Sequence, residues 1–221
     1  MFRLITVERE YGCGGPAIAA ALADHLGWQL WDHLLTEEIA RIANVHPSAV
    51  SRCDERMDSR LHRLAKTFWR GSYERSSPLG QQIFDTDRMM SMMQDIMNRI
   101  GREGNVVVVG RGAPYFLREN PCAFHVFLYA PRAEKIRRII AEGHAEEDAE
   151  DLVDSVDRER AAYVKYYFNA DWPTRSLYHL MLNTAVGNEP VVHTILSTMR
   201  ELAGTPKATD YEAPKAPIPI S

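Results

Sequence analysis

The sequence has few cysteines and no long apolar run. Its three cysteines, Cys13, Cys53 and Cys122, are scattered and include no CxxC pair, so they predict neither a zinc site nor a disulfide framework. Nowhere do about 18 apolar residues follow one another, and the chain does not start with an apolar leader. We therefore expect a cytoplasmic protein with no membrane segment.

An excess of positive charge is also missing. The net charge of -4 gives no indication of a nucleic-acid polymer as partner. Lysine is scarce and arginine is common, and arginine is the residue that binds phosphate in a bidentate way. The length of 221 residues is enough for one sizeable core, and we predict a single domain over residues 1–204.

Short apolar segments alternate with amphipathic ones along this domain. The apolar segments predict strands at 2–8, 28–32, 105–110, 123–130 and 178–184. The amphipathic segments predict helices at 17–27, 36–45, 47–69, 86–104, 131–143, 146–168 and 189–204. This alternation predicts an α/β three-layer sandwich with a five-stranded parallel sheet. The segment 71–80 reads as a polar loop. The tail 205–221 has four prolines and few apolar anchors, so we expect it to be disordered.

The segment "ITVEREYGCGG" carries the first strand into a glycine-rich turn, and a helix follows. Gly12, Gly14 and Gly15 would let successive backbone N–H groups converge on an anion, and the helix from about Pro16 would add the positive end of its dipole. These are the physical requirements of a phosphate-binding loop. In a parallel sheet this turn lies at the carboxyl edge, where ligands bind.

The loop departs from the full phosphate-loop motif, G-x-x-x-x-G-K-[ST]. With Gly14 set on the second glycine, Gly15 falls where lysine belongs, Pro16 where serine or threonine belongs, and Arg9 where the first glycine belongs. On spacing alone the segment could equally be a compact strand-to-helix turn.

Cys13 suggests another possibility, a reactive thiolate at a helix N-terminus. A tyrosine-phosphatase loop would have arginine six residues after the cysteine, and this chain has Ala19 there. The residues therefore favour a phosphate-binding loop or a plain turn over a cysteine nucleophile.

Later segments bring arginines toward the same edge. The segment "VVVVGRGAPYFLR" predicts a buried strand that ends at Arg111, and the alternative for this residue is a surface turn. Arg158 and Arg160, in "DRERAAYVKYYF", are two apart on a helix and do not share a face. They could clamp a phosphate if the helix closes as a lid, or they could belong to a solvated charged helix.

In these segments, and in "WDHLLTEEIA", "HVFLYAP", "EKIRR" and "LYHLMLNT", the sequence resembles the cytidylate kinase-like family of P-loop proteins, which are relatives of the nucleoside monophosphate kinases. The resemblance runs from about residue 3 to 203. It implies a phosphate loop after the first strand, a helical acceptor-binding region over 33–104 and a lid over 144–175. The implied reaction is transfer of the γ-phosphoryl group of ATP, with Mg²⁺, to CMP or dCMP.

The resemblance also assigns roles to residues. The donor phosphates would lie on the loop residues Gly12, Cys13, Gly14 and Gly15. Arg111 matches the arginine of a Gly-Arg-Asp segment that holds the acceptor nucleotide, and Asp32 lies where the family has an aspartate near the acceptor. Asp157, Arg158 and Arg160 match the Asp-Arg-x-Arg of the lid, and with Arg111 they are the expected catalytic residues. Nothing in the sequence identifies metal ligands.

Three departures from the family pattern leave two functions open. The loop lacks the lysine, it has Pro16 and Ala17 where the family often has arginine and glutamate, and Gly112 replaces the aspartate of Gly-Arg-Asp. One function is a kinase that uses arginines in place of the lysine, with Arg9 reaching into the loop. The other is a nucleotide-binding pseudokinase with a regulatory role. A basic side chain found along the loop would favour the kinase.

Overall fold

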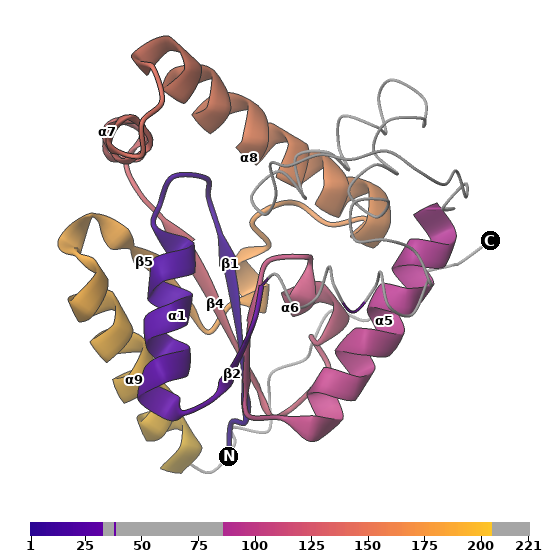
Figure 1. Cartoon of the computed structure of the whole chain (residues 1–221). Coiled ribbons are helices and arrows are strands. Elements are labelled where there is room, and N and C mark those ends of the chain that lie inside the picture. The colour runs from indigo at the N-terminus through magenta and orange to yellow at the C-terminus, as the bar shows by residue number, and fades with distance from the viewer. Residues whose placement is uncertain (33–37, 39–85, 205–221) are drawn as a thin grey trace.

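The computed structural model describes residues 1–32, 38 and 86–204, and Figure 1 shows their arrangement. The strands are β1 (Leu4–Arg9), β2 (Gln29–Trp31), β3 (Val106–Val109), β4 (Ala123–Tyr129) and β5 (Leu180–Asn183). The helices are α1 (Gly15–Leu26), α5 (Thr86–Glu103), α6 (Ala113–Phe116), α7 (Arg132–Ala141), α8 (Glu146–Phe168) and α9 (Asn188–Gly204). The helices predicted at 36–45 and 47–69, the loop at 71–80 and the tail at 205–221 lie outside the described residues.

All strands lie parallel in one five-stranded sheet with the order β2-β3-β1-β4-β5. The five predicted strands are confirmed, with ends displaced by no more than two residues. The chain leaves β1 toward β2 on one side and leaves β3 toward β4 on the other. The adjacent strands β1 and β3 therefore form the switch point where open α/β sheets bind ligands.

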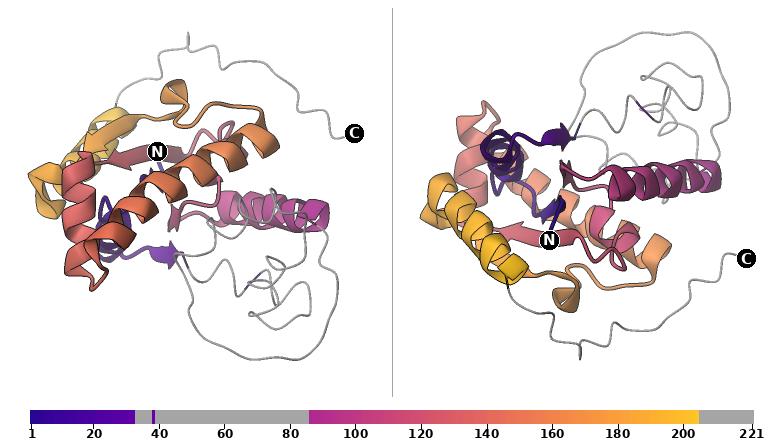
Figure 2. Two further views of the ribbon diagram at one scale, coloured as in Figure 1. Left: turned by 90° about the horizontal axis from the view of Figure 1, so that it is seen from above. Right: turned by 90° about the horizontal axis from the view of Figure 1, so that it is seen from below.

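Helices cover both faces of the sheet, as the α/β prediction requires (Figures 1 and 2), and an apolar layer lies under each set. Leu4 packs with the buried face of α5, which includes Met93 and Ile96. Ile5 and Val7 pack with α1 and α9 on the other face. The alternation along β1 follows from the period of two residues in a strand, so neighbouring residues serve opposite layers.

Helix α8 crosses the carboxyl edge of the sheet, above the turn that follows β1 (Figures 1 and 2). It packs on α7 through a small apolar cluster that includes Ile139 and Val153. At its far end, Tyr163 and Phe168 pack in an aromatic cluster with Tyr115 of α6. The predicted lid segment thus includes a helix that is anchored at both ends.

A buried polar pair lies inside the sheet, away from the carboxyl edge. Thr6 Oγ1 lies 2.7 Å from His125 Nδ1, and the backbone N–H of His125 donates to His179 Nδ1 at 3.0 Å. Burial, together with the nearby His179, lowers the pKa of His125 to about 3, while the Leu117 carbonyl opposes this shift. His125 is therefore neutral in the folded protein near neutral pH.

Across the residues that the structure describes, no helix combines the length and the apolar character that a membrane span needs.

Candidate functional site at the carboxyl edge of β1 and β3

The turn between β1 and α1 has the backbone of an anion-binding loop. Gly12 and Gly14 adopt φ values of 73° and 79°, which favour glycine. A Cβ on Gly12 would lie 2.9 Å from Ile139 Cδ1, so α7 also leaves no room for a side chain. The helix begins at Gly15 with Pro16 in its first turn. Within the described residues, the N–H groups of Gly12, Cys13 and Gly14 donate to no backbone carbonyl.

Two side chains, one from α7 and one from the turn after β5, hold the loop in this shape. Arg138 of α7 donates to the Cys13 carbonyl at 2.6 Å, and Thr184 Oγ1 donates to the same oxygen at 2.7 Å. Arg138 also binds Glu134 at 2.8 Å and the Thr184 carbonyl at 2.8 Å. The donors of Arg138 are thus engaged with protein acceptors, and this arginine serves the loop's conformation.

Cys13 is fully buried and packs in the apolar core that includes Ile5 and Ile18. Burial raises the pKa of the thiol to about 11, although the Gly15 N–H opposes the shift. A thiol with such a pKa is protonated at neutral pH and is a poor nucleophile. The structure therefore argues against the thiolate alternative. Cys13 contributes to the loop through its backbone N–H and carbonyl groups and not through its thiol.

Arg9, the last residue of β1, lies along this loop. A Cβ on Gly15 would meet Arg9 Cγ at 2.8 Å and Arg9 Cβ at 3.1 Å. Farther along the side chain, Arg9 Cζ lies 2.9 Å from the place that a Cβ on Gly110 would take. The arginine therefore stretches from the start of α1 to the end of β3, across the switch point of the sheet. It is a basic side chain along the loop, which is the observation that would favour the kinase over the pseudokinase.

The turn after β3 places Arg111 in the same region. Gly110, Arg111 and Gly112 have φ values of 63°, 61° and 67°, and such a value is unfavourable for arginine. This turn folds Arg111 inward, and only 2% of the residue is exposed. Burial and the nearby Arg9 lower the pKa of Arg111 to about 10, while Asp32 opposes the shift. Arg111 and Asp32, predicted near the acceptor, are thus electrostatic neighbours.

The structure leaves no room for an aspartate side chain at position 112, directly after Arg111. A Cβ on Gly112 would lie 2.8 Å from Phe168 Cε2, at the end of α8. The aromatic ring fills the space that the aspartate side chain would need. The departure at Gly112 is therefore matched by the packing of α8 against α6.

Helix α8 brings Asp157 and Arg160 to the loop. Asp157 Oδ1 accepts from the Tyr11 N–H at 2.8 Å, and Asp157 Oδ2 accepts from Lys135 at 3.0 Å. Arg160 is 7% exposed and donates to the Arg9 carbonyl at 2.8 Å. Lys135 also binds Glu10 at 2.9 Å, so α7, α8 and the loop share one polar network.

Arg158 lies apart from this network. Its residue is exposed, and its Nε donates to the Asp154 carbonyl of its own helix at 2.8 Å. The structure brings together Arg111, Asp157, Arg160 and the loop glycines, but it does not bring Arg158 to them. The sequence prediction that Arg158 and Arg160 do not share a face is confirmed.

Sequence reasoning missed Glu8. It is 1% exposed and lies at the carboxyl end of β1, with its Oε1 3.8 Å from Arg9 Nη1. Burial raises the pKa of Glu8, although Arg9, Arg160 and Arg111 act in the opposite direction. The burial of Glu8 could have been predicted from strand periodicity. Leu4, Thr6 and Glu8 lie on one face of β1, and Leu4 packs in the core on that face.

The residues fit ATP phosphates better than they fit a metal ion by itself. Among the described residues, no group of three or more His, Cys, Asp or Glu side chains is placed to hold a metal. Mg²⁺ is commonly held through substrate phosphates with few protein ligands, so it would enter with the nucleotide. The loop N–H groups and the arginines would supply the matching anion site.

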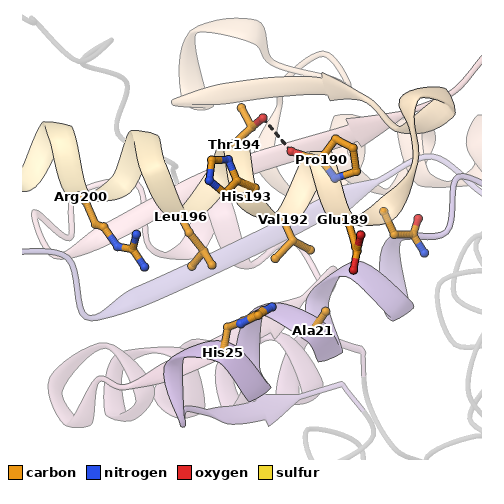
Figure 3. Close-up of a pocket in the computed structure, with 10 residues that line it drawn as sticks. Ala21, His25, Glu189, Pro190, Val192, His193, Thr194, Leu196 and Arg200 are labelled. Atoms are coloured by element: carbon orange, nitrogen blue, oxygen red, sulfur yellow. Dashed lines mark hydrogen bonds between the residues drawn. The ribbon is translucent and has the colours of Figure 1, made fainter.

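A separate groove of about 680 Å³ runs between α1 and α9 (Figure 3). Asn188 marks its loop end, since its Oδ1 lies 3.6 Å from the place of a Gly14 Cβ. Its lining also includes His25, His193 and Arg200, which are exposed. The groove lies on the outer layer, apart from the arginines at the switch point.

Comparisons with known proteins agree with this geometry. The model of the cytidylate kinase-like family matches residues 4–186. No curated protein sequence matches the chain significantly. An uncharacterized protein from Eubacterium ventriosum has a similar structure, with a TM-score of 0.62, 18% identity, and coverage of 90% of this chain and 99% of that one.

Two kinases of known structure share the fold at lower similarity. Shikimate kinase from Acinetobacter baumannii, in complex with shikimate, matches with a TM-score of 0.51 and 14% identity, covering 93% of this chain and 97% of that one. A gluconokinase from Sinorhizobium meliloti matches with a TM-score of 0.50 and 15% identity, covering 90% and 92%. At such identities these likenesses establish the P-loop kinase fold and leave the substrate open.

Proposed function

Because the chain belongs to the cytidylate kinase-like family, we propose that it is a nucleoside monophosphate kinase that transfers the γ-phosphoryl group of ATP to CMP or dCMP. The observation that carries the proposal is the convergence of three arginines on the switch point. Arg9 comes from β1, Arg111 from the turn after β3 and Arg160 from α8. Burial lowers the pKa of Arg111, and repulsion by the positive charges of Arg9 and Arg160 lowers it further.

The carboxylates of Glu8, Asp32 and Asp157 offset only part of the repulsion within such a convergence. Like charges at low exposure repel one another, and burial weakens the screening by water. The phosphates of two nucleotides would offset this repulsion. Phosphoryl transfer needs mainly alignment and positive charge around the transferred group, and arginines from separate segments supply both.

The remaining roles follow from position. The N–H groups of Gly12, Cys13 and Gly14 would bind the donor phosphates, and Mg²⁺ would arrive with ATP. Arg111 and Asp32 would hold the acceptor, for which the region 33–104 is proposed. Asp157 and Arg160 would keep the loop and α8 together around the phosphates.

The lid role of 144–175 belongs to the same proposal, and it needs motion. Arg158 would reach the phosphates only in an arrangement of α8 that differs from the one described, since its Nε now binds Asp154. Lid closure of this kind excludes water and completes the charge around the transferred group.

The pseudokinase alternative has its own supporting observation. Arg160 Nη1 already binds the Arg9 carbonyl and lies 3.3 Å from Asp157 Oδ1. The donors of Arg138 are engaged by the Cys13 carbonyl, Glu134 and Thr184. The loop also offers Pro16 where other phosphate loops offer a hydroxyl for Mg²⁺. A protein with these features could bind nucleotides and leave them unchanged.

Substitution of Arg111 tests the acceptor role. We expect Arg111→Gln to weaken CMP binding about tenfold or more, because a charge-assisted hydrogen bond contributes about 1.5–3 kcal/mol. Titration calorimetry with CMP and separately with ATP is the measurement, and Arg118→Gln, at an exposed arginine, is the matched control. Equal CMP affinity in Arg111→Gln and wild type would remove Arg111 from the acceptor site.

A further inference from the structure

The side chain of Arg9 fills the room that a lysine at position 15 would need. A Cβ on Gly15 would meet Arg9 Cγ at 2.8 Å, Arg9 Cβ at 3.1 Å and Arg9 Cδ at 3.5 Å. These contacts are too close for an undisturbed side chain. The φ angle of Gly15 is not positive, so it is space and not backbone conformation that keeps a larger residue out. The path of Arg9 therefore requires glycine at position 15, where other phosphate loops have lysine.

The guanidinium end of Arg9 likewise leaves no room for a side chain at position 110. Arg9 Nη1 occupies the place that a Cβ on Gly110 would take, and Arg9 Cζ lies 2.9 Å from it. Gly110 also has a φ of 63°, in the region that favours glycine. Arg9, Gly15 and Gly110 therefore form a matched set, in which two glycines make room for one arginine.

The donors of this guanidinium are available to a ligand. In the part of the chain that the structure describes, they make no hydrogen bond to a protein acceptor, and the ion pair with Glu8 at 3.8 Å is longer than one. The side chain is 13% exposed. Arg138 contrasts with it, because its donors bind Glu134, the Cys13 carbonyl and Thr184.

From these contacts we propose that Arg9 is the donor-phosphate cation of this protein, in the role that a loop lysine has elsewhere. The proposal rests on the proposed function, since it concerns the ATP side of the same site. A guanidinium can bind two phosphate oxygens at once, so it can bridge the loop and the transferred group. Its position between α1 and β3 places the charge beside Arg111, which would hold the acceptor.

Two variants separate the charge of Arg9 from its packing. Arg9→Met keeps an unbranched stem against Gly15 and removes the charge. Arg9→Ala combined with Gly15→Lys removes the contacts with Cγ and Cδ, leaves the 3.1 Å approach of the Cβ, and returns a cation from the position that the lysine usually has. ATP binding is measured by calorimetry with Mg²⁺ and without any acceptor, and CMP binding is measured separately. The exposed arginine variant Arg118→Met is the control.

We expect Arg9→Met to weaken ATP binding about tenfold or more and to leave CMP binding within about twofold. The double variant Arg9→Ala/Gly15→Lys should recover at least part of the lost affinity. Unchanged ATP affinity in Arg9→Met, or wild-type protein that binds no ATP, would overturn the assignment. Wild-type protein that binds ATP without turning over CMP would overturn the kinase proposal alone, because this test reads binding and not turnover.

Discussion

Lys135 Nζ donates to Asp157 Oδ2 at 3.0 Å, and this pair joins α7 to α8 beside the glycine loop. Burial alone would lower the pKa of Lys135, but hydrogen bonds to Glu10 and Asp157 leave it raised. Asp157 also accepts the Tyr11 N–H, so the pair fixes the backbone of the loop as well as the two helices. The site therefore depends on a small polar network for its shape.

Loss of Asp157 should destabilise the fold. Asp157→Ala leaves Lys135 as a buried charge with one partner fewer, and breaking such a pair costs about 3 kcal/mol. Asp154→Ala is the matched control on the same helix, since its pair with Arg132 is half exposed and such pairs contribute about 0–1 kcal/mol. Urea denaturation gives both values. A loss below about 1 kcal/mol for Asp157→Ala would show that the network is not structural.

Steric exclusion at Gly112 can be separated from backbone strain. Gly112 and Gly27 have φ values of 67° and 62°, but only Gly112 has a side chain, Phe168, against its missing Cβ. Alanine at either position costs about 1–2 kcal/mol of left-handed strain. We expect Gly112→Ala to cost about 1 kcal/mol or more beyond Gly27→Ala, because overpacking adds its own penalty. Equal losses in thermal denaturation would mean that Phe168 moves aside freely.

Substitution of Arg158 tests the proposed lid, because it should change kcat without changing stability. Its side chain is at the surface and binds only the Asp154 carbonyl in the described structure, so Arg158→Ala should leave the melting temperature unchanged. If α8 closes on bound nucleotides, the same variant should lower kcat on the order of 10²-fold, as for loss of a transition-state donor. An unchanged kcat would take Arg158 out of the site and leave Arg160 as the arginine of this helix that serves it.

The buried His125 predicts a loss of stability in acid. The pKa of His125 is about 3 in the folded protein and about 6.5 when unfolded. Between these two pH values the unfolded chain binds a proton at His125 and the folded chain does not. The free energy of unfolding is therefore retained above pH 6.5 and falls as the pH drops toward 3. The slope approaches about 1.4 kcal/mol per pH unit for this single group.

His125→Gln is the variant that isolates this effect, because glutamine can still bond to Thr6 and cannot take up the proton. Unfolding free energies from pH 7.5 to 4.5, for wild type and variant, are the measurement. We expect the wild type to lose stability faster below pH 6.5. Parallel curves would show that His125 is not the group responsible.

Much of the fold followed from local pattern. Five apolar segments with intervening helices predicted the parallel sheet, and the position of each strand was correct to within two residues. The short helix α6 was missed, because four residues after a glycine turn carry no periodic signal. The helix predicted at 17–27 was correct in its end, because α1 ends at Leu26 and is capped by Gly27 with a φ of 62°.

The site was harder to predict because it depends on tertiary contacts. The prediction paired Arg158 with Arg160, yet Val153, Val156, Arg160 and Val164 form one buried stripe at helical spacing. That stripe already indicated that Arg160 faces inward. The path of Arg9 across Gly15 had no such signal, because it joins residues of different elements, and sequence spacing does not specify how a long side chain packs between them.

If three converging arginines support phosphoryl transfer without the loop lysine, the purified protein should turn over nucleotides. The decisive experiment is a coupled assay of ADP release with ATP and Mg²⁺, using CMP, dCMP, UMP and AMP as acceptors. We predict ADP release with CMP or dCMP above that with UMP or AMP, and a strong loss of it in Arg9→Met. Tight binding of ATP and CMP by calorimetry without any ADP release would contradict the kinase proposal and identify a nucleotide-binding protein that lacks the chemistry.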